Sequence, residues 1–354
     1  MRISGRSLVM ALALSFAGSG GAADLTPELG RPRPAPLGTP NVPPLPPAAV
    51  DNSLIIGGDD LKARKADTRM TVEVHVNGRG PYHFVVDSGA DTSVVGVGIA
   101  RDLALPLGTP AILNGTTDRA IVDRVKVDQL LLGQTTFGNL ELPALKEYDL
   151  GGQGMIGIDA LVNQRLMMDF EKHVIKVEDA REPEHHERGE IVIVARRRHG
   201  QLILTQVTAA GLPLDAVIDT GSEVTIGNLA LRDKLIHGNR DKFTSVQATG
   251  VTGVSMDLQL ARIAELKLGP VTLRNVPIAF ADVPPFTLFG LSKQPALLLG
   301  TDLLANFRRV SLDFRARKVR FQLKRCGSYD VSVTTDPDAS FMRLSTVNDV
   351  ACLR

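Results

Sequence analysis

The sequence predicts an all-β protein made of two similar lobes with few short helices. Three observations lead to this fold class. Two stretches of the 354-residue chain carry the same motifs in the same order. Within each stretch, short apolar and β-branched runs are separated by turn residues, which is typical of strands. Apolar residues make up 44% of the chain and charged residues 22%, a composition that supports packed cores and disfavours disorder.

The first 50 residues differ from the rest of the chain. Residues 1–23 begin with basic residues and continue with a short apolar run and small residues, the pattern of a secretory signal peptide. The run is shorter than the roughly 20 residues that span a bilayer, and an N-terminal anchor is the alternative. Proline-rich residues 24–50 predict an extended linker, with a removable pro-segment as the alternative. We therefore expect an exported protein, periplasmic or secreted, with no membrane span in its mature chain.

The internal repeat decides the domain organisation. The matched segments are 81–90 with 213–222, 130–133 with 266–269, 157–163 with 300–306, and 169–170 with 313–314. The offset between the copies grows from 132 (219 − 87) to 144 (313 − 169) without any change of order. A duplicated unit lengthened by loop insertions explains this pattern. We expect lobe 1 over residues 51–180, a charged linker over 181–190, lobe 2 over 191–325 and a tail over 326–354.

The elements of each unit are expected mostly as strands. The first strands are expected over residues 70–76 and 202–207, the strands before a Gly turn over 126–132 and 260–268, and the terminal hairpins over 165–177 and 310–323. A short helix is expected after Gly157 or Gly300, with Asp159 or Asp302 as its N-cap. For Asp169 and Asp313, a turn role suffices.

Each copy carries an aspartate at the end of an apolar strand, followed by a small hydroxyl residue and glycine. If a pseudo-twofold axis relates the lobes, Asp87 and Asp219 face each other and share one proton, because two close carboxylates cannot both ionise. The ionised partner would then activate a water while the protonated partner donates to a carbonyl oxygen. The residues expected to support the two loops are Ser88, Gly89, Thr220, Gly221 and Ser222. A Ser222 hydroxyl donating to Asp219 would favour ionised Asp219 and leave the proton on Asp87.

The segment Phe84-Val-Val-Asp87-Ser-Gly-Ala-Asp-Thr resembles the active-site strand of retropepsin-like aspartic proteases. Ile156-Gly157 and Leu299-Gly300 resemble the second signature of that family, an apolar-apolar-Gly strand beneath the catalytic loop. The resemblance covers residues 68–177 and 191–323. It implies the acid-protease double barrel, with the two-lobed pepsin arrangement built from short, retropepsin-sized units. It also implies an aspartic endopeptidase acting on a peptide or protein substrate with no cofactor and no metal.

The resemblance further implies a flap over the catalytic loops. By position, the flap candidates are Asn114, Gly115 and Thr116 in lobe 1 and Thr249 and Gly250 in lobe 2. Pepsins carry a tyrosine on their flap, and no tyrosine falls in either segment here. This difference favours a retropepsin-like lid on each lobe.

Other features leave alternatives open. The same fold could serve as a non-cleaving periplasmic peptide-binding or scaffold protein, and each lobe could pair with a lobe of another chain, although we expect a monomer. The near-balance of 40 basic and 39 acidic residues argues against a nucleic-acid partner. In an exported chain, Cys326 and Cys352 predict one disulfide that closes the tail, with two free thiols as the alternative. His185-His186 lies in a charged segment and indicates a solvated linker rather than a metal site.

Overall fold

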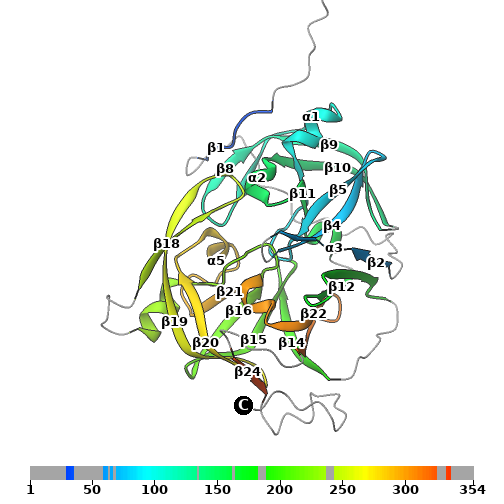
Figure 1. Cartoon of the computed structure of the whole chain (residues 1–354). Coiled ribbons are helices and arrows are strands. Elements are labelled where there is room, and N and C mark those ends of the chain that lie inside the picture. The colour runs from blue at the N-terminus through cyan, green and yellow to red at the C-terminus, as the bar shows by residue number, and fades with distance from the viewer. Residues whose placement is uncertain are drawn as a thin grey trace, which may run out of the picture.

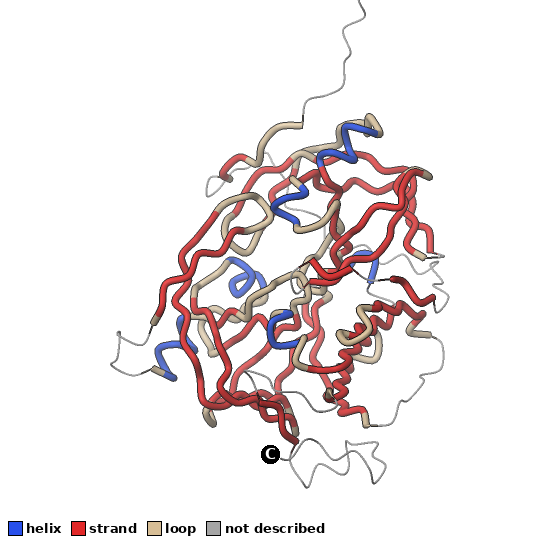
Figure 2. The backbone as a smooth tube through the Cα atoms, viewed as in Figure 1, coloured by secondary structure: helices blue, strands red, loops and turns tan. Residues whose placement is uncertain are grey.

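The computed structural model describes residues 29–35, 59–62, 64–66, 69–133, 135–161, 164–181, 189–236, 243–324 and 332–335. The expected signal peptide, the His185-His186 pair and the Cys326–Cys352 disulfide lie outside these residues. Two lobes stack along the long axis of the molecule (Figure 1), and strands make up most of both (Figure 2). The all-β, two-lobed prediction is confirmed. No helix among the described residues has the length and apolar character needed to cross a membrane.

Lobe 1 is a closed barrel of six strands. In spatial order these are β4 (Arg69–Val76), β5 (Arg79–Val86), β11 (Gly154–Ile156), β6 (Val94–Gly96), β10 (Thr135–Leu145) and β9 (Arg124–Leu132). Pairing of β4 with β9 closes the ring. Its short helices are α1 (Val97–Asp102), α2 (Glu147–Leu150) and α3 (Ile158–Leu161), and β3 (Arg64–Ala66) extends the sheet at β4. The inward side chains, alternating along each strand, form a buried apolar core.

Lobe 2 repeats this barrel. Its strands, in spatial order, are β15 (Gln201–Ala209), β16 (Leu212–Ile218), β21 (Ala296–Leu299), β17 (Ile226–Gly227), β20 (Val271–Phe280) and β19 (Ser255–Leu268). Pairing of β15 with β19 closes the ring, and β24 (Ser332–Thr335) lies against β20. Its helices are α4 (Leu229–Leu235), α5 (Pro284–Leu288) and α6 (Thr301–Leu304). The repeat in the sequence is therefore a repeat in the fold.

A sheet shared by both lobes joins the barrels. Its strand order is β14 (Glu190–Arg198), β23 (Lys318–Leu323), β22 (Phe307–Asp313), β12 (Gln164–Asp169), β13 (Val174–Asp179) and β2 (Asp59–Lys62). The two hairpins expected at the ends of the lobes are β12–β13 and β22–β23, and they pair with each other through β12 and β22. The lobes are thus held together by main-chain hydrogen bonds as well as by side chains.

Two buried ion pairs cross this sheet. Arg165 Nε lies 3.2 Å from Asp313 Oδ2, and Arg309 Nε lies 2.6 Å from Asp169 Oδ2. Both arginines and both aspartates are related by the same repeat offset, 144 (309 − 165 and 313 − 169). The aspartates also accept turn N–H bonds, for example from Lys172 to Asp169 at 2.8 Å. The turn role expected for these residues is therefore only part of what they do.

The expected caps of the short helices were wrong. Asp159 lies within α3 and accepts hydrogen bonds from the backbone N–H and the hydroxyl of Ser93, at 2.9 and 2.7 Å. Asp302 lies within α6 and binds Thr225 in the same way, at 3.0 and 2.7 Å. The partners are far away in sequence, so a local capping pattern could not reveal them. Both aspartates instead anchor the segment that follows each Asp-Ser/Thr-Gly loop.

Candidate active site

Each candidate catalytic aspartate lies where a buried strand ends. Asp87 follows β5, and its N–H donates to the Ile156 carbonyl of β11 at 2.9 Å. Asp219 follows β16, and its N–H donates to the Leu299 carbonyl of β21 at 3.1 Å. Strands β11 and β21 run parallel to β5 and β16, respectively. The apolar-apolar-Gly strands therefore lie directly beside the aspartates.

The glycine that ends each apolar-apolar-Gly strand is fixed by the same small network. Gly157 N–H donates to the Ser93 hydroxyl at 3.0 Å, and Gly300 N–H donates to the Thr225 hydroxyl at 3.0 Å. These hydroxyls are the ones held by Asp159 and Asp302. Burial raises the pKa of both carboxyls, although the hydrogen bonds they accept act in the opposite direction. Asp159 and Asp302 therefore stabilise Gly157 and Gly300 indirectly, through the hydroxyl groups of Ser93 and Thr225.

Backbone N–H groups of each loop hold one oxygen of its aspartate. Gly89 and Ala90 donate to Asp87 Oδ1 at 2.7 and 3.1 Å. Gly221 and Ser222 donate to Asp219 Oδ1, both at 3.1 Å. Such donors stabilise the ionised form of a carboxyl group and fix its orientation. One oxygen of each carboxyl group is therefore held by the backbone of its own loop.

The two loops are tied to each other by hydroxyl groups. Ser88 Oγ donates to the Ile218 carbonyl at 2.9 Å, and Thr220 Oγ1 donates to the Val86 carbonyl at 2.8 Å. Each hydroxyl also accepts the N–H of the other residue, at 2.9 Å from Ser88 and 3.2 Å from Thr220. Both side chains are buried. The two loops are therefore one rigid unit spanning the lobe boundary.

This arrangement brings the two carboxyl groups into contact. Asp87 and Asp219 are hydrogen-bonded to each other and are only 9% and 8% exposed. Glycine is needed at both loop positions, because a Cβ on Gly89 would collide with the Asp219 carboxyl and one on Gly221 with that of Asp87. A hydrogen bond between two carboxyl groups requires a proton on one of them.

The surroundings of Asp219 favour the protonated form of its carboxyl group near neutral pH. Burial, and then the neighbouring charge of Asp87, raise the pKa of Asp219 to about 8. The expectation that the Ser222 hydroxyl would favour ionised Asp219 was wrong. That hydroxyl donates to the Val224 carbonyl at 2.8 Å and only the Ser222 backbone N–H serves Asp219.

Comparison with known protein families matches residues 72–160 and 205–303 to one family, described as aspartyl protease. The matched residues make up more than half of the chain, and each stretch contains one Asp-Ser/Thr-Gly loop and its apolar-apolar-Gly strand. The chain belongs to the aspartyl protease family. The resemblance seen in the sequence is thereby confirmed, with both repeats as members. A search of curated proteins finds no match to the chain.

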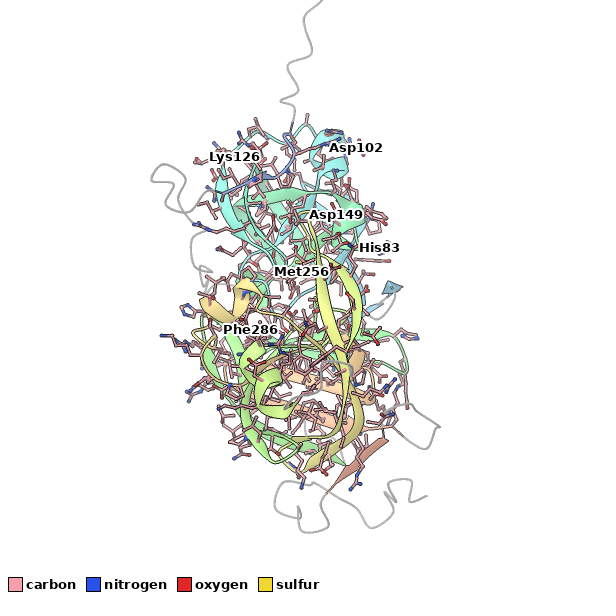
Figure 3. All side chains as sticks on the ribbon, turned by 90° about the vertical axis from the view of Figure 1, so that its left-hand side faces the viewer. His83, Asp102, Lys126, Asp149, Met256 and Phe286 are labelled. Atoms are coloured by element: carbon pink, nitrogen blue, oxygen red, sulfur yellow. The ribbon has the colours of Figure 1, made fainter. Side chains whose placement is uncertain are left out.

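Two hairpins of this aspartyl protease occupy the positions of the expected flaps. Lid 1 is β7 (Ala111–Asn114) with β8 (Arg119–Val122), and lid 2 is β18 (Thr244–Thr249) with the first half of β19. The flap candidates of the sequence, Asn114, Gly115, Thr116, Thr249 and Gly250, lie at or next to the hairpin turns. Lid 2 extends from its own lobe toward Asp149 of lobe 1 (Figure 3).

The tips of the two lids touch. Thr252 Oγ1 of lid 2 donates to Asp118 Oδ1 of lid 1 at 2.5 Å. Next to it, Val251 packs against a buried apolar cluster of lobe 1, as Leu113 and Ala90 also do. Ala90 is three residues from Asp87, so the tip of lid 2 and the Asp87 loop pack on the same cluster. Sequence reasoning missed these contacts, although an apolar residue in a polar lid tip was a usable signal.

Among the residues that the structure describes, no three His, Cys, Asp or Glu side chains are grouped as a metal site requires.

Proposed function

We propose that the protein is an aspartic endopeptidase that hydrolyses peptide bonds with a water molecule activated between Asp87 and Asp219. The observation that carries this proposal is the hydrogen-bonded pair of buried carboxyl groups, of which Asp219 has a pKa raised to about 8. Such a pair holds one base and one acid side by side at neutral pH. Membership of the aspartyl protease family supports peptide hydrolysis as the reaction class.

The proposed reaction begins with water between the carboxyl groups. Ionised Asp87 takes a proton from the water while the oxygen of that water attacks the peptide carbonyl carbon. Asp219 donates its proton to the carbonyl oxygen in the same step. The product of this step is a tetrahedral diol. When it collapses, Asp87 passes its proton to the leaving nitrogen, the C–N bond breaks, and a diol hydroxyl returns its proton to Asp219. The pair ends in its starting state, and the products are a carboxylic acid and an amine.

The proposed substrate is an extended peptide or an unfolded protein segment. Lids 1 and 2 are β-hairpins, and an extended chain can hydrogen-bond to such main-chain groups while its side chains enter separate pockets. The contact between Thr252 and Asp118 must open for a polymer to enter. Lid movement of this kind is a common way of enclosing a substrate away from bulk water.

The test is cleavage of an unfolded protein mixture by the purified chain across a pH series, with new termini identified by mass spectrometry. Asp87→Asn and Asp219→Asn should each lower kcat/KM by roughly 10²–10⁴-fold, the contribution of a general acid or base. Asp128→Asn, which alters an exposed aspartate of lobe 1, is the matched control and should keep full activity. Inhibition by a peptide containing a transition-state-mimicking hydroxyl should follow the same pattern.

Other outcomes of this test are informative. Peptide binding without cleavage at any pH would favour the non-cleaving binding protein on the same fold. Cleavage that persists in both aspartate variants would remove the pair from the mechanism.

We also propose that the protein is exported and works as a monomer. The basic and apolar pattern of residues 1–23 supports export, and both aspartates come from one chain, which supports a monomeric site. We propose a Cys326–Cys352 disulfide for the same oxidising setting. Determination of the mature N-terminus, sizing in dilute solution and thiol titration of the unfolded chain test these three statements.

A further inference from the structure

The two catalytic loops are supported differently, despite their common origin. In lobe 2, the carbonyl of Ser222 accepts both the N–H and the hydroxyl of Thr301, at 2.8 and 3.0 Å. The Ser222 hydroxyl adds its own bond to Val224. In lobe 1, the matched residues are Ala90 (222 − 132) and Ile158 (301 − 143), and neither has a hydroxyl. Only the backbone bond from Ile158 N–H to the Ala90 carbonyl, at 2.9 Å, is kept.

A residue of lobe 2 supplies the missing support to lobe 1. Gln201, the first residue of β15, is completely buried. Its Nε2 donates to the Asp91 carboxylate and lies 3.5 Å from the Gly89 carbonyl oxygen. Gly89 and Asp91 lie on either side of Ala90 in the chain. The side-chain amide of Gln201 therefore contacts the Gly89–Asp91 turn at both ends. By the repeat offset, the position matching Gln201 is Arg69 (201 − 132), so the residue type is not repeated.

The Gly89–Asp91 turn also supplies the Gly89 and Ala90 N–H groups that donate to Asp87. Gly89 donates to Asp87 at 2.7 Å, whereas its counterpart Gly221 donates to Asp219 at 3.1 Å. A shorter N–H bond to a carboxylate favours its ionised form more strongly. The charged groups facing this region are Asp219, which faces Asp87, and His199, whose charge acts on Asp91.

We propose that Gln201 is a positioning residue that holds the lobe 1 loop so that Asp87 stays ionised and Asp219 keeps the shared proton. This inference rests on the proposed peptidase function. Gln201 does not face the reacting atoms; it acts through Gly89 and Asp91. The duplicated protein thus departs from its own symmetry, because the lobe 1 loop is contacted by Gln201 of the opposite lobe, whereas the Thr301 hydroxyl that contacts the lobe 2 loop comes from the same lobe.

The experiment measures kcat/KM against pH for the full chain with a cleavable peptide. In Gln201→Ala, the acid limb of the profile should move to higher pH by roughly half a unit to one unit, because weaker N–H bonds stabilise the ionised form of Asp87 less. The value of kcat should fall about 10-fold with KM changed by less than about 2-fold, since the alignment of the base is lost and substrate contacts are not. Gln206→Ala, on the exposed face of the same strand, should match the wild type.

A rescue variant separates positioning from general damage. Ala90→Ser combined with Ile158→Thr installs the lobe 2 supports in lobe 1, and in the Gln201→Ala background it should move the acid limb back. Gln201→Glu keeps the side-chain size and replaces Gln201→Ala in the experiment if the alanine variant does not fold. It should also move the acid limb to higher pH. An acid limb at the wild-type pH in folded Gln201→Ala or Gln201→Glu would overturn the inference. A wild-type chain that cleaves nothing would instead overturn the proposed function, so the two failures are distinguishable.

Discussion

Ser88 and Thr220 occupy the same position in the two repeats, and each donates its hydroxyl hydrogen to a carbonyl of the opposite lobe. Each hydroxyl oxygen also accepts the other residue's N–H. Four hydrogen bonds therefore cross the lobe boundary directly beneath the carboxyl pair. The separation of Asp87 and Asp219 is set by these bonds, and not by the carboxyl groups themselves, which would repel each other if both were ionised.

Replacing Thr220 with Val should damage both stability and activity. The change keeps the shape but leaves the Ser88 N–H and the Val86 carbonyl buried without a partner at this position. We expect the free energy of unfolding to fall by about 2 kcal/mol, the usual penalty for such groups. Activity should fall further than stability explains, because the carboxyl pair loses its spacing. Urea unfolding and kcat/KM measured on the same preparation check both effects.

Thr220→Ser is the control for this prediction, because it keeps the hydroxyl and removes only a methyl group. It should retain most of the wild-type stability and activity. A Thr220→Val variant with unchanged kcat/KM would show that the four bonds do not set the carboxyl spacing.

Replacing Asp169 with Asn should weaken the joint between the lobes. Asp169 is 1% exposed and lies 2.6 Å from Arg309, so the change leaves a charged guanidinium with a neutral neighbour. Removing one partner of a buried pair costs about 3 kcal/mol in free energy of unfolding. Burial alone would raise the pKa of Asp169, but the bonds from Arg309 and backbone N–H groups lower it overall. The stabilisation is therefore present above the unfolded pKa and is lost as pH falls through the folded pKa.

Asp233→Asn offers a matched comparison for that ion pair. Asp233 is paired with Arg232, but its side chain is 64% exposed, so its loss should change stability by less than about 0.5 kcal/mol. Thermal unfolding of both variants at neutral and acidic pH makes the comparison. Equal effects for the two substitutions would contradict a structural role for the buried pair.

Features that follow the repeat were readable from the sequence. The expected strands over residues 70–76 and 202–207 lie within β4 and β15, because apolar alternation and turn residues recur in both copies. The close approach of two Asp-Ser/Thr-Gly loops likewise follows from a pseudo-twofold axis. The same reasoning could have found Arg165 and Arg309, which share the offset of the aspartates that they bind.

Features that depend on contacts between distant residues, or on differences between the two repeats, could not be predicted from the sequence. Asp159 and Asp302 matched a local capping pattern, yet their carboxyl groups bind segments more than 60 residues away. Ser222 was assigned to Asp219 by proximity in sequence, but a nearer carbonyl takes its hydroxyl. Gln201 carries no motif at all, and its role depends on which lobe lacks hydroxyl groups.

The raised pKa of Asp219 predicts a stability that decreases with rising pH. Below the unfolded pKa of about 3.8, the Asp219 carboxyl is protonated in both the folded and the unfolded chain. It then has no effect on how the free energy of unfolding depends on pH. Between that value and about 8 the unfolded chain releases the proton while the folded chain keeps it, so the free energy of unfolding falls. Asp219→Asn removes this loss and should be more stable than the wild type near pH 7.

Unfolding midpoints between pH 4 and pH 8 test this prediction. The difference between Asp219→Asn and the wild type should widen as pH rises, and Asp128→Asn should show no such trend. A constant difference across the series would contradict a buried proton on Asp219. The alkaline limb of kcat/KM should fall in the same range, since loss of that proton removes the acid.

The segment before the first barrel braces lid 1, which leads to a prediction for its removal. β1 (Arg33–Pro34) pairs with the outer edge of β8, beside the lid (Figure 1). Ala35 N–H donates to the Arg119 carbonyl at 3.0 Å, and Gly30 N–H donates to Asp123 at 2.7 Å. Among the described strands, none pairs with the corresponding outer edge of β18 in lid 2. Lid 1 therefore has a third strand along its outer edge, whereas lid 2 has none among the described strands.

Deleting residues 1–35 should loosen lid 1, whereas deleting residues 1–28 should not. In the longer deletion, amide hydrogen exchange in the β7–β8 hairpin should accelerate about 10-fold, because a short hairpin without a third strand is only marginally stable. KM should rise while the thermal midpoint of the barrels changes little. The shorter deletion keeps every contact of β1 and isolates the effect of the brace. Identical exchange in the two deletions would mean that the lid holds its position without the segment, and that lid asymmetry arises from the hairpins themselves.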